Sequence, residues 1–507
     1  MGSNMHQQIR ISWILIFILI FAFWIRIYHL SSNPVELFSD EITQVLSARS
    51  IIETGKDING KFNLFLYNKI KLGTPTYGYL ACTSTYIFGN NPFAVRLPAA
   101  IAGTISVFLI YLISKIISKN DFASLLASFI GAIVPWGIYF SRIGWEPALT
   151  VPFLLVSIYL LLKAIETDSY LKLIGSFSFF GLSFYASDTL TLYAPLFLIT
   201  ILTINYKYLV KNLTKFIIPS VIFIVITTPF VYVSLTNPLK NDRAVKLSTF
   251  KTGINHESLR IFTKNYFAHF NYDFLFKIGD PNLRHGTGVD GVLYPAILLF
   301  IIIGILFTLK NYKNKVNILL IFWLLYFPLG GSLTNDGVPH ATRTLIGWPI
   351  FTIFTAIGIK GMIQIIVNKK LIRLIIIFFF IILMINFTKF FNNYYIEYPV
   401  RSQSWWEYGQ KQVYDEVKRI ANGNESLCLG NIDYWHEETL NHYYLGYNYK
   451  IIYDTNNLNC LKSDILVLPP TITVSEEYKL EKNILDLERN IKWSIYKRSL
   501  QAPLTNL

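Results

Sequence analysis

Ionisable side chains in this sequence gather where long apolar stretches end. They form five clusters, which lie at 39–41, 142–146, 188, 279–285 and 335–343. Ionisable groups beside hydrocarbon are costly to place, so their default interpretation is functional. The members that could do chemistry are Asp40, Glu41, Arg142, Glu146, Asp280, Arg284, His285, His340 and Arg343. If they all lie on one side of a membrane, they can converge on a single cavity at its boundary.

These residue types suit glycosyl transfer from a lipid-linked phosphate. An acceptor hydroxyl loses a proton as it attacks the anomeric carbon, so a carboxylate base must lie within hydrogen-bond distance. The departing phosphate gains charge, which the planar guanidinium of arginine stabilises well. We predict Asp40 and Glu146 as catalytic residues. The predicted phosphate-binding residues are Arg284, Arg343, Arg142, His285 and Lys71, and the predicted supporting residues are Glu41, Asp280 and His340.

Several of these residues also have purely structural interpretations. Asp40 can cap the helix that follows it, and Glu146 can be a first-turn acid before Pro147. Arg142 can reach the lipid head groups along apolar surface, and Asp188 can be an ordinary turn residue. The same alternative holds for Arg284, His285 and His340. No cluster has the spacing of a zinc site, so no metal is assigned, no cofactor is expected to be obligatory and a divalent cation is not favoured.

The elements that must position these residues are membrane-spanning helices. Hydrophobic residues make up 53% of the 507 positions and charged residues only 15%, too few to cover a soluble protein of this size. Apolar stretches of about 20 residues, the length that spans a bilayer, recur over the first 390 positions. The first stretch is too long for a signal peptide and lacks a cleavage site. The predicted spans are 9–30, 92–118, 121–141, 147–165, 170–186, 190–208, 215–236, 290–309, 315–333, 342–366 and 371–391.

The positive charges determine the orientation of these spans. With the N-terminus in the cytoplasm, fourteen lysines and arginines fall in inner loops and only Arg26, Arg142 and Arg343 fall at outer ends, as the positive-inside rule requires. The inner residues are Arg10, Lys115, Lys119, Lys163, Lys172, Lys207, Lys211, Lys215, Lys310, Lys313, Lys315, Lys369, Lys370 and Arg373. This spread explains the net charge of +14 without a nucleic-acid partner. Residues 73–88 would invert the later loops as a span and are predicted as an amphipathic helix on the outer surface.

Two long outer loops, 31–91 and 237–290, and a C-terminal tail complete the chain. We expect an all-α polytopic membrane domain (1–391), with amphipathic helices in the first outer loop, and a small soluble α/β domain (392–507) outside the cell. In the tail we predict a helix at 403–421 and strands at 426–429, 451–453, 465–468 and 493–496. Cys428 and Cys460 can pair in an oxidising compartment, or remain two free cysteines.

The clusters resemble motifs of a known family. The stretch FSDEITQVLSARSIIETGKDINGK, followed by TPTYGYL and FGNNPFAVRLPAAIAG, resembles the start of the family 39 glycosyltransferases of the type C superfamily. This group includes the protein O-mannosyltransferases and resembles the lipid A aminoarabinose transferases. SRIGWEPAL, GDPNLRHGTG and NDGVPHATRTLIGWP are similar to later motifs, in the same order.

The resemblance implies specific roles for some residues. Asp40 matches the catalytic base of the first outer loop, and Glu146 matches the acid of the second. A lysine that precedes the proline of the aminoarabinose transferases is absent, since Gly73 and Thr74 precede Pro75; Lys71 or Lys69 are its possible substitutes. The resemblance therefore does not identify the sugar.

The sequence predicts an inverting glycosyltransferase in the cell membrane. It would move one sugar from a polyprenyl phosphate to a hydroxyl of a protein, lipid or glycan on the outer face. A transporter or flippase of lipid-linked sugars would place ionisable groups near the bilayer midplane, often in repeated halves, which this sequence does not show. A non-catalytic binding scaffold would not need Asp40. A metal-dependent oligosaccharyltransferase would need more carboxylates in the second outer loop, which offers only Glu146.

Overall fold

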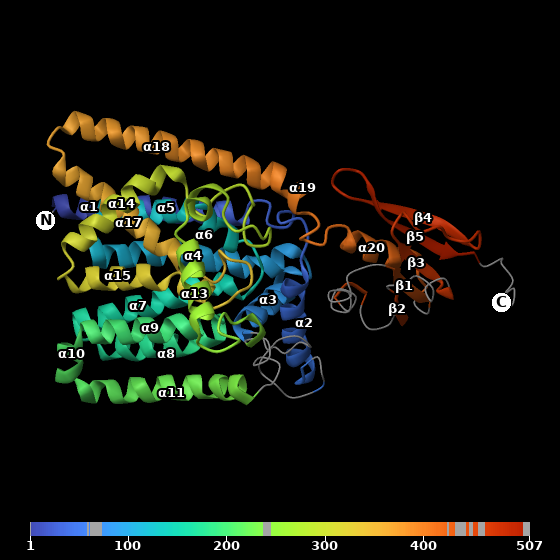
Figure 1. Ribbon diagram of the computed structural model, residues 1–507, viewed down its shortest axis with the longest axis horizontal. Coiled ribbons are helices and arrows are strands. Elements are labelled where there is room, and N and C mark those ends of the chain that lie inside the picture. The colour runs from blue at the N-terminus through green and yellow to red at the C-terminus, as the bar shows by residue number, and fades with distance from the viewer. Residues whose placement is uncertain are drawn as a thin grey trace.

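Long helices run side by side in this computed structural model, and a small sheet lies beyond one end of the bundle (Figure 1). The structure describes residues 2–57, 60, 74–236, 245–422, 425–430, 443–445, 450–454 and 462–499. The bundle contains α1 (Gly2–Ile27), α4 (Pro92–Ser118), α5 (Asp121–Ile133), α6 (Pro135–Phe140), η1 (Glu146–Leu149), α7 (Thr150–Thr167), α8 (Tyr170–Ala186), α9 (Leu190–Ile204), α10 (Tyr206–Lys211), α11 (Leu213–Thr236), η3 (Pro295–Ile297), α14 (Leu298–Lys310), α15 (Lys315–Tyr326), α16 (Leu329–Ser332), α17 (Gly347–Ile365) and α18 (Lys369–Asn392).

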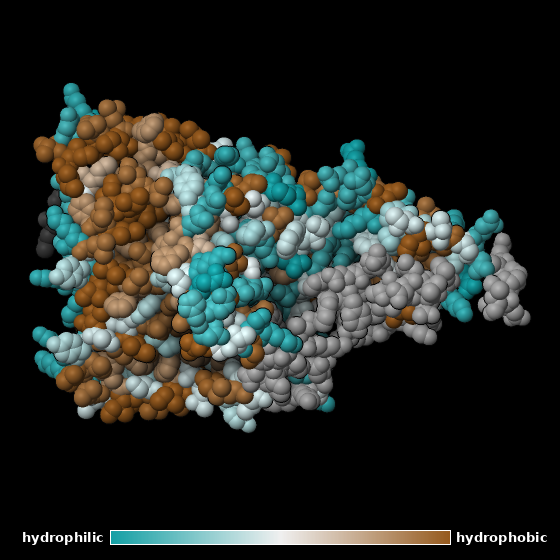
Figure 2. All heavy atoms as spheres, in the orientation of Figure 1, coloured by the Kyte–Doolittle hydropathy of each residue, from teal (hydrophilic) through white to brown (hydrophobic). Residues whose placement is uncertain are grey.

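Every predicted span corresponds to a helix or to a broken pair of helices. Within the described residues, six helical segments are long and apolar enough to cross a membrane, and four shorter helices are also apolar. Apolar side chains cover the side of the bundle in Figure 2, while hydrophilic ones gather at its two ends. Such a surface is compatible with hydrocarbon around the bundle and water at its ends. The count of eleven spans remains a prediction.

Two predicted spans differ from the helices in an informative way. The span at 121–141 is broken at Val134, which is extended because it precedes Pro135. The short helix α6 then turns toward the loop at 279–293. There the backbone N–H of Trp136 donates to the Val292 carbonyl at 3.0 Å. The span predicted from 342 starts only at Gly347 in α17. Residues 335–346 therefore remain a loop that can carry side chains into a site.

The two ends of the bundle differ in charge. The connections α4–α5, α7–α8, α9–α11, α14–α15 and α17–α18 lie at the end away from the sheet (Figure 1), and they carry the lysines predicted to be inside. Contacts between these connections brace that end, such as the Lys215 to Asp168 ion pair at 2.7 Å. We call this the lysine end and the opposite end the sheet end. The segregation agrees with the predicted threading, and which end faces the cytoplasm remains a prediction.

Both long loops that were predicted to be outer ones fold into helices at the sheet end. The first contains α2 (Ser39–Thr54) and α3 (Pro75–Phe88), which pack on each other and, through α3, on α4. Tyr77 and Ala81 of α3 are buried while Tyr86 and Ile87 are exposed, so this helix is amphipathic as expected. The second loop contains α13 (His256–Ala268) and η2 (Asp273–Lys277). A bridge between Ser248 and Thr334 connects it to the loop before α17.

The chain after α18 first packs on the bundle and only then forms the sheet. η4 (Asn393–Glu397) and α19 (Tyr398–Ser402) bury Tyr394 and Tyr398, and the helix α20 (Gln410–Ile420) follows. The prediction of a helix from 403 was wrong over its first seven residues. Glu407 and Gly409 have φ values of +54° and +96°, which a right-handed helix does not allow. We propose a domain boundary near Gly409 rather than at 392.

The described part of the tail contains a five-stranded sheet in the order β2-β1-β3-β5-β4. The strands are β1 (Ser426–Gly430), β2 (Lys450–Asp454), β3 (Ile465–Leu468), β4 (Tyr478–Leu485) and β5 (Ile491–Arg498). β1 pairs in parallel with β2 and β3, and β5 pairs antiparallel with β3 and β4. Four strands were expected and β4 was missed, because its alternating lysines and glutamate lie on an exposed edge. Cys428 is disulfide-bonded and Cys82 is free, while Cys460 lies outside the described residues.

Candidate active site

The Asp-Glu pair of the first outer loop divides into two roles. Glu41 is fully buried and forms a bidentate ion pair with Arg96 of α4, with N–O distances of 2.9 and 3.0 Å. Its carboxylate also accepts hydrogen bonds from the backbone N–H groups of Gly144 and Phe38, at 2.6 and 3.2 Å. Glu41 therefore ties the start of α2 to the bundle. Asp40, by contrast, is only partly buried and lies in the first turn of α2.

Asp40 and Glu146 lie near the same face of α2. Gln44 follows Asp40 by one helical turn, so both side chains point to one side. The Gln44 side-chain amide donates to the Glu146 carboxylate at 2.7 Å. The Glu146 carboxylate is thus bonded to α2 one helical turn after Asp40, although Glu146 and α2 are far apart in sequence.

Arg284 lies at the sheet end in a loop that several elements hold in place. Two tyrosine hydroxyls, from Tyr139 of α6 and Tyr398 of α19, donate to the Leu283 carbonyl, each at 2.6 Å. The Arg284 guanidinium lies 4.9 Å from the centre of the Phe38 ring, directly before α2. It also donates to the Trp405 carbonyl at 2.6 Å. The predicted phosphate ligand is therefore positioned against the N-terminus of the helix that carries Asp40.

Glu407 is a site residue that sequence reasoning missed. Its carboxyl group contacts Arg284 at 3.2 Å and lies near enough to the backbone of Ser39 and to Asp40 for both to affect its pKa. Its left-handed backbone conformation, with φ of +54°, is of the kind that concentrates at functional sites. The one signal in the sequence is an acidic residue inside the aromatic run SWWEYG, and this has no periodicity that would distinguish it.

Burial raises the pKa of Glu407 to about 8. The Arg284 guanidinium lowers this pKa, and the nearby charges of Asp40 and Glu36 raise it. Burial also raises the pKa of Glu36 to about 7, against the backbone N–H groups of Gly409 and Lys411, which lower it. Glu36 and Asp40 therefore lie near enough to Glu407 to raise its pKa, and Glu407 holds its proton at neutral pH.

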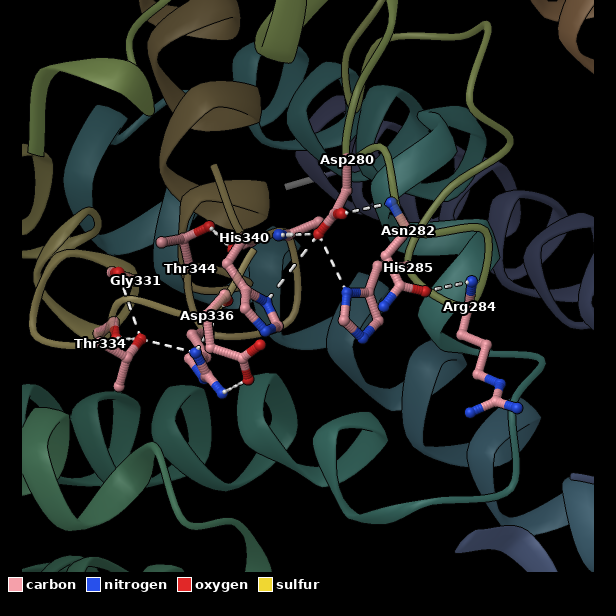
Figure 3. A network of polar contacts seen from close by, with 12 residues as sticks. Asp280, Asn282, Arg284, His285, Gly331, Thr334, Asp336, His340 and Thr344 are labelled. Carbon is pink, nitrogen blue, oxygen red and sulfur yellow. Dashed lines mark hydrogen bonds and ion pairs between the residues drawn. The ribbon is translucent and has the colours of Figure 1, made fainter. Parts of the chain in front are cut away.

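A second cluster joins the two later motifs. Asp280 is almost fully buried, and its carboxylate lies 3.1 Å from His285 Nδ1 and 3.9 Å from His340 Nδ1. The two imidazole rings stack with centres 4.6 Å apart, and Trp145 stacks on the outer face of His285. Figure 3 shows both rings directed toward Asp280, with Arg284 directed away from them. Burial lowers the pKa of His340 well below its usual range, and His285, Arg343 and His269 lower it further.

The remaining predicted phosphate ligands have different positions. Arg343 lies close to the second cluster and is held by Thr334 Oγ1 at 2.6 Å and by the Asp336 carboxylate at 3.1 Å. Arg142 is fully buried and donates to the carbonyls of Ile25, Arg26 and Asn33. We therefore correct its assignment from phosphate binding to a structural tie between α1 and the loops. Lys71 and Lys69 lie outside the described residues.

The chain is similar to known proteins in sequence and in fold. Residues 73–233 match the family model described as dolichyl-phosphate-mannose-protein mannosyltransferase. A segment of 101 residues is 38% identical to "Putative mannosyltransferase YkcB" of Bacillus subtilis strain 168, and it covers 20% of this chain and 14% of that relative. The chain thus spans a small part of the curated relative that it matches.

Solved structures extend the similarity to almost the whole chain. ArnT from Cupriavidus metallidurans bound to undecaprenyl phosphate superposes with a TM-score of 0.62 at 11% identity, over 97% of this chain and 99% of that one. The oligosaccharyltransferase AglB from Archaeoglobus fulgidus, in complex with an inhibitory peptide and a dolichol phosphate, superposes with a TM-score of 0.54 at 11% identity, over 88% of this chain and 64% of that one.

The class that these findings define is the type C glycosyltransferase fold, in a multi-pass membrane protein. Within that class, the chain resembles the protein O-mannosyltransferases in sequence and ArnT in structure, as the motifs indicated. The predicted fold class and family resemblance are confirmed.

Proposed function

We propose that this protein is an inverting glycosyltransferase that moves a single sugar from a polyprenyl phosphate to an acceptor hydroxyl at the sheet end of the bundle. The observation that carries the proposal is the position of Arg284, which contacts Glu407 at 3.2 Å and lies 4.9 Å from the ring centre of Phe38, two residues before Asp40. This position brings a candidate base and a candidate phosphate ligand to one place. The sheet end is proposed to face the outside of the cell, because the lysine end has the charge of a cytoplasmic face.

In this proposal Asp40 removes the proton from the acceptor hydroxyl. Its side chain is partly exposed in the first turn of α2, whereas the side chain of the neighbouring Glu41 is buried in an ion pair with Arg96. Glu146 lies on the same side of α2 and is proposed to orient the acceptor or the sugar. A single base beside the acceptor supports direct displacement, and hence inversion, because a covalent intermediate would need a second acid as nucleophile.

Arg284 is proposed to bind the phosphate that leaves with the polyprenol. Glu407 has a pKa of about 8, so below that pH it accepts a hydrogen bond from Arg284 without neutralising the guanidinium. The positive charge of Arg284 therefore remains available to the bridging oxygen as the glycosidic bond breaks. A prepositioned cation of this kind commonly contributes a few kcal/mol at a water-poor site. Arg343 is proposed as a second contact.

The similarity to ArnT, solved with undecaprenyl phosphate, and to AglB, solved with a dolichol phosphate, supports a lipid phosphate as donor. The acceptor is proposed to be a hydroxyl of a protein, lipid or glycan. A pyrophosphate donor with a metal bound by the first two loop acids is less well supported. In the described residues, the group that has metal-ligand spacing does not include Asp40 or Glu146.

The experiment that tests this function is sugar transfer by the purified chain in nanodiscs. Polyprenyl monophosphate sugars and polyprenyl pyrophosphate sugars are offered in parallel, with a mixed extract of envelope acceptors, and the release of polyprenyl phosphate or polyprenyl pyrophosphate is measured. We expect release from a monophosphate donor by the wild type and not by Asp40→Asn. Asp273→Asn, the same change at an exposed acid of η2, is the matched control and should behave as wild type. Release from pyrophosphate donors alone, or equal release by Asp40→Asn, would refute the proposal.

A further inference from the structure

Asp280, His285 and His340 place three metal-ligating atoms together. One ligand atom of each side chain lies within 4.8 Å of the other two. His285 and His340 both present Nδ1 to the same carboxylate oxygen of Asp280. The three side chains come from two loops that are separated in sequence by α14, α15 and α16.

The Nδ1 atom of His340 is in a position that hydrogen bonding within the cluster does not explain. Its side chain is 8% exposed, and its Nδ1 has no hydrogen-bond partner among the described residues. This nitrogen is directed at Asp280 Oδ2 from 3.9 Å, which is too far for a hydrogen bond. A buried polar atom without a partner is costly, and a bound ion is a recognised explanation for one.

The surrounding structure holds each of the three residues in place. The Asp280 carboxylate accepts the backbone N–H groups of Asn282 and Ala341, at 2.9 and 2.8 Å. The His340 backbone N–H donates to His269 Nε2 at 3.0 Å. His285 is stacked between Trp145 and His340. Such outer partners orient metal ligands and raise metal affinity.

We propose that Asp280, His285 and His340 form a binding site for a divalent transition-metal ion of the Zn²⁺ class. Two imidazole nitrogens and one carboxylate oxygen are the ligands that such ions prefer, whereas Mg²⁺ and Ca²⁺ prefer oxygen alone. Three protein ligands leave the fourth tetrahedral position for water or another small ligand. The partial exposure of the His285 side chain, 12%, leaves an approach to that position.

Binding requires movements of the three side chains, whose ligand atoms lie within 4.8 Å of one another. Ligand atoms around a tetrahedral zinc ion are about 3.4 Å apart, given bonds of about 2.1 Å. The Asp280 to His285 distance of 3.1 Å is close to this value, and the Asp280 to His340 distance of 3.9 Å must shorten slightly. Both rings must also rotate so that each Nδ1 lone pair points at the ion. His285 would then carry its proton on Nε2.

The proposed ion would connect the loop at 279–291 to the loop at 335–346. These loops also carry Arg284 and Arg343, so the ion would fix the distance between the two proposed phosphate contacts. Metal binding does not depend on the reaction proposed above and is tested without it. A failure of metal binding leaves the glycosyltransferase proposal in place, and a failure of sugar transfer leaves the metal proposal in place.

The experiment measures metal bound to the full chain in detergent, after removal of any histidine tag and treatment with a chelator. Zn²⁺ is added, excess metal is removed by desalting, and the metal content per chain is determined. Co²⁺ serves as a second probe, because a tetrahedral site shows characteristic visible absorption. We expect one equivalent in the wild type and a loss of affinity of at least about 10²-fold in His340→Gln and Asp280→Asn, since even outer partners are worth 10- to 100-fold.

His256→Gln, at an exposed position of α13, is the matched control and should bind as wild type does. His340→Gln is the decisive variant because its Nδ1 makes no hydrogen bond whose loss would unfold the chain. Added Zn²⁺ should raise the unfolding temperature of the wild type and not that of His340→Gln, and added Mg²⁺ should do neither. No metal in the wild type, or wild-type affinity in a folded His340→Gln variant, would overturn the proposal.

Discussion

Arg284 and Glu407 are 123 positions apart in sequence, yet the Arg284 guanidinium donates a hydrogen bond to the Glu407 carboxyl group at 3.2 Å. Arg284 belongs to the loop before α14, and Glu407 belongs to the connection between α19 and α20. The pair closes the sheet end of the bundle beside Phe38 and Asp40. It makes the segment after the last span part of the candidate site, rather than a linker to the sheet.

The pH dependence of donor binding should follow Glu407, whose pKa burial raises to about 8. Below this pH the acid is protonated and Arg284 keeps its net charge, so donor binding is strongest. Above it the carboxylate neutralises Arg284, and KM for the donor should rise as pH passes through about 8. A sugar phosphodiester does not titrate in this range. In Glu407→Gln, the rise of KM for a monophosphate donor near pH 8 should be absent. A rise near pH 8 that persists in this variant would contradict the assignment.

The pH dependence of the stability of the folded chain should also reflect the titration of Glu407. The pKa of Glu407 is raised in the folded state from its ordinary 4.5 to about 8. Its contribution to stability is therefore fully present below about pH 4.5 and is lost as pH rises through about 8. We expect the unfolding temperature of the wild type to fall more steeply over this window than that of Glu407→Gln. Parallel curves would show that burial does not perturb the acid.

Asp40→Asn should lower kcat by about 10²-fold or more, because it keeps the shape of the side chain and removes the base. The donor KM should change little, since the phosphate contacts remain. The product of the wild type should have the opposite anomeric configuration to the donor, as NMR of the released glycoside can show. Retention of configuration would exclude direct displacement with Asp40 as sole base.

Arg284→Lys should reduce donor binding and turnover by about 10- to 10²-fold, because lysine keeps the charge and loses the planar fork. Arg343→Lys should have a smaller effect, since two of its donors already bond to Thr334 and Asp336. Arg260→Lys, at an exposed pair with Glu257, is the control. If both site variants keep wild-type donor affinity and rate, the phosphate is bound elsewhere.

Glu41→Gln should destabilise the protein rather than alter its chemistry. The Glu41 to Arg96 pair is fully buried, and removing one charge leaves the other unpaired at a cost of about 3–5 kcal/mol. A lower unfolding temperature, with near-normal turnover of the molecules that remain folded at low temperature, would fit this structural role. A loss of turnover without a loss of stability would instead place Glu41 in the reaction.

Single cysteines introduced into the 310–315 loop and at Gln410 should be labelled from opposite sides of the membrane. The first position lies at the lysine end and the second beyond the sheet end (Figure 1). Cys82 is buried in α3, so it should give little background in intact vesicles. Labelling of both positions from one side would refute the topology.

The sequence by itself determined the helical bundle, the order of its elements and the clusters that meet at one end. Hydropathy and charge bias are properties of short segments, so the spans at 92–118 and 170–186 and the separation of lysines from the acid clusters are visible without any fold. Strands at 426–429 and 465–468 were predictable for the same reason. Helix ends were less predictable. The start of α17 was placed five residues too early because apolar loop residues continue the hydropathy of the span.

Only the tertiary structure decided which charged groups meet. Arg142 and Arg284 were both predicted phosphate ligands, with Arg284 preferred, but Arg142 is enclosed by backbone carbonyls whereas Arg284 faces Phe38 and Glu407. Glu407 has no local pattern that distinguishes it from a surface acid. Its role depends on a turn with positive φ that carries it back to the start of α2. The partner of a charge is set by contacts between segments that are distant in sequence, and no local periodicity encodes those contacts.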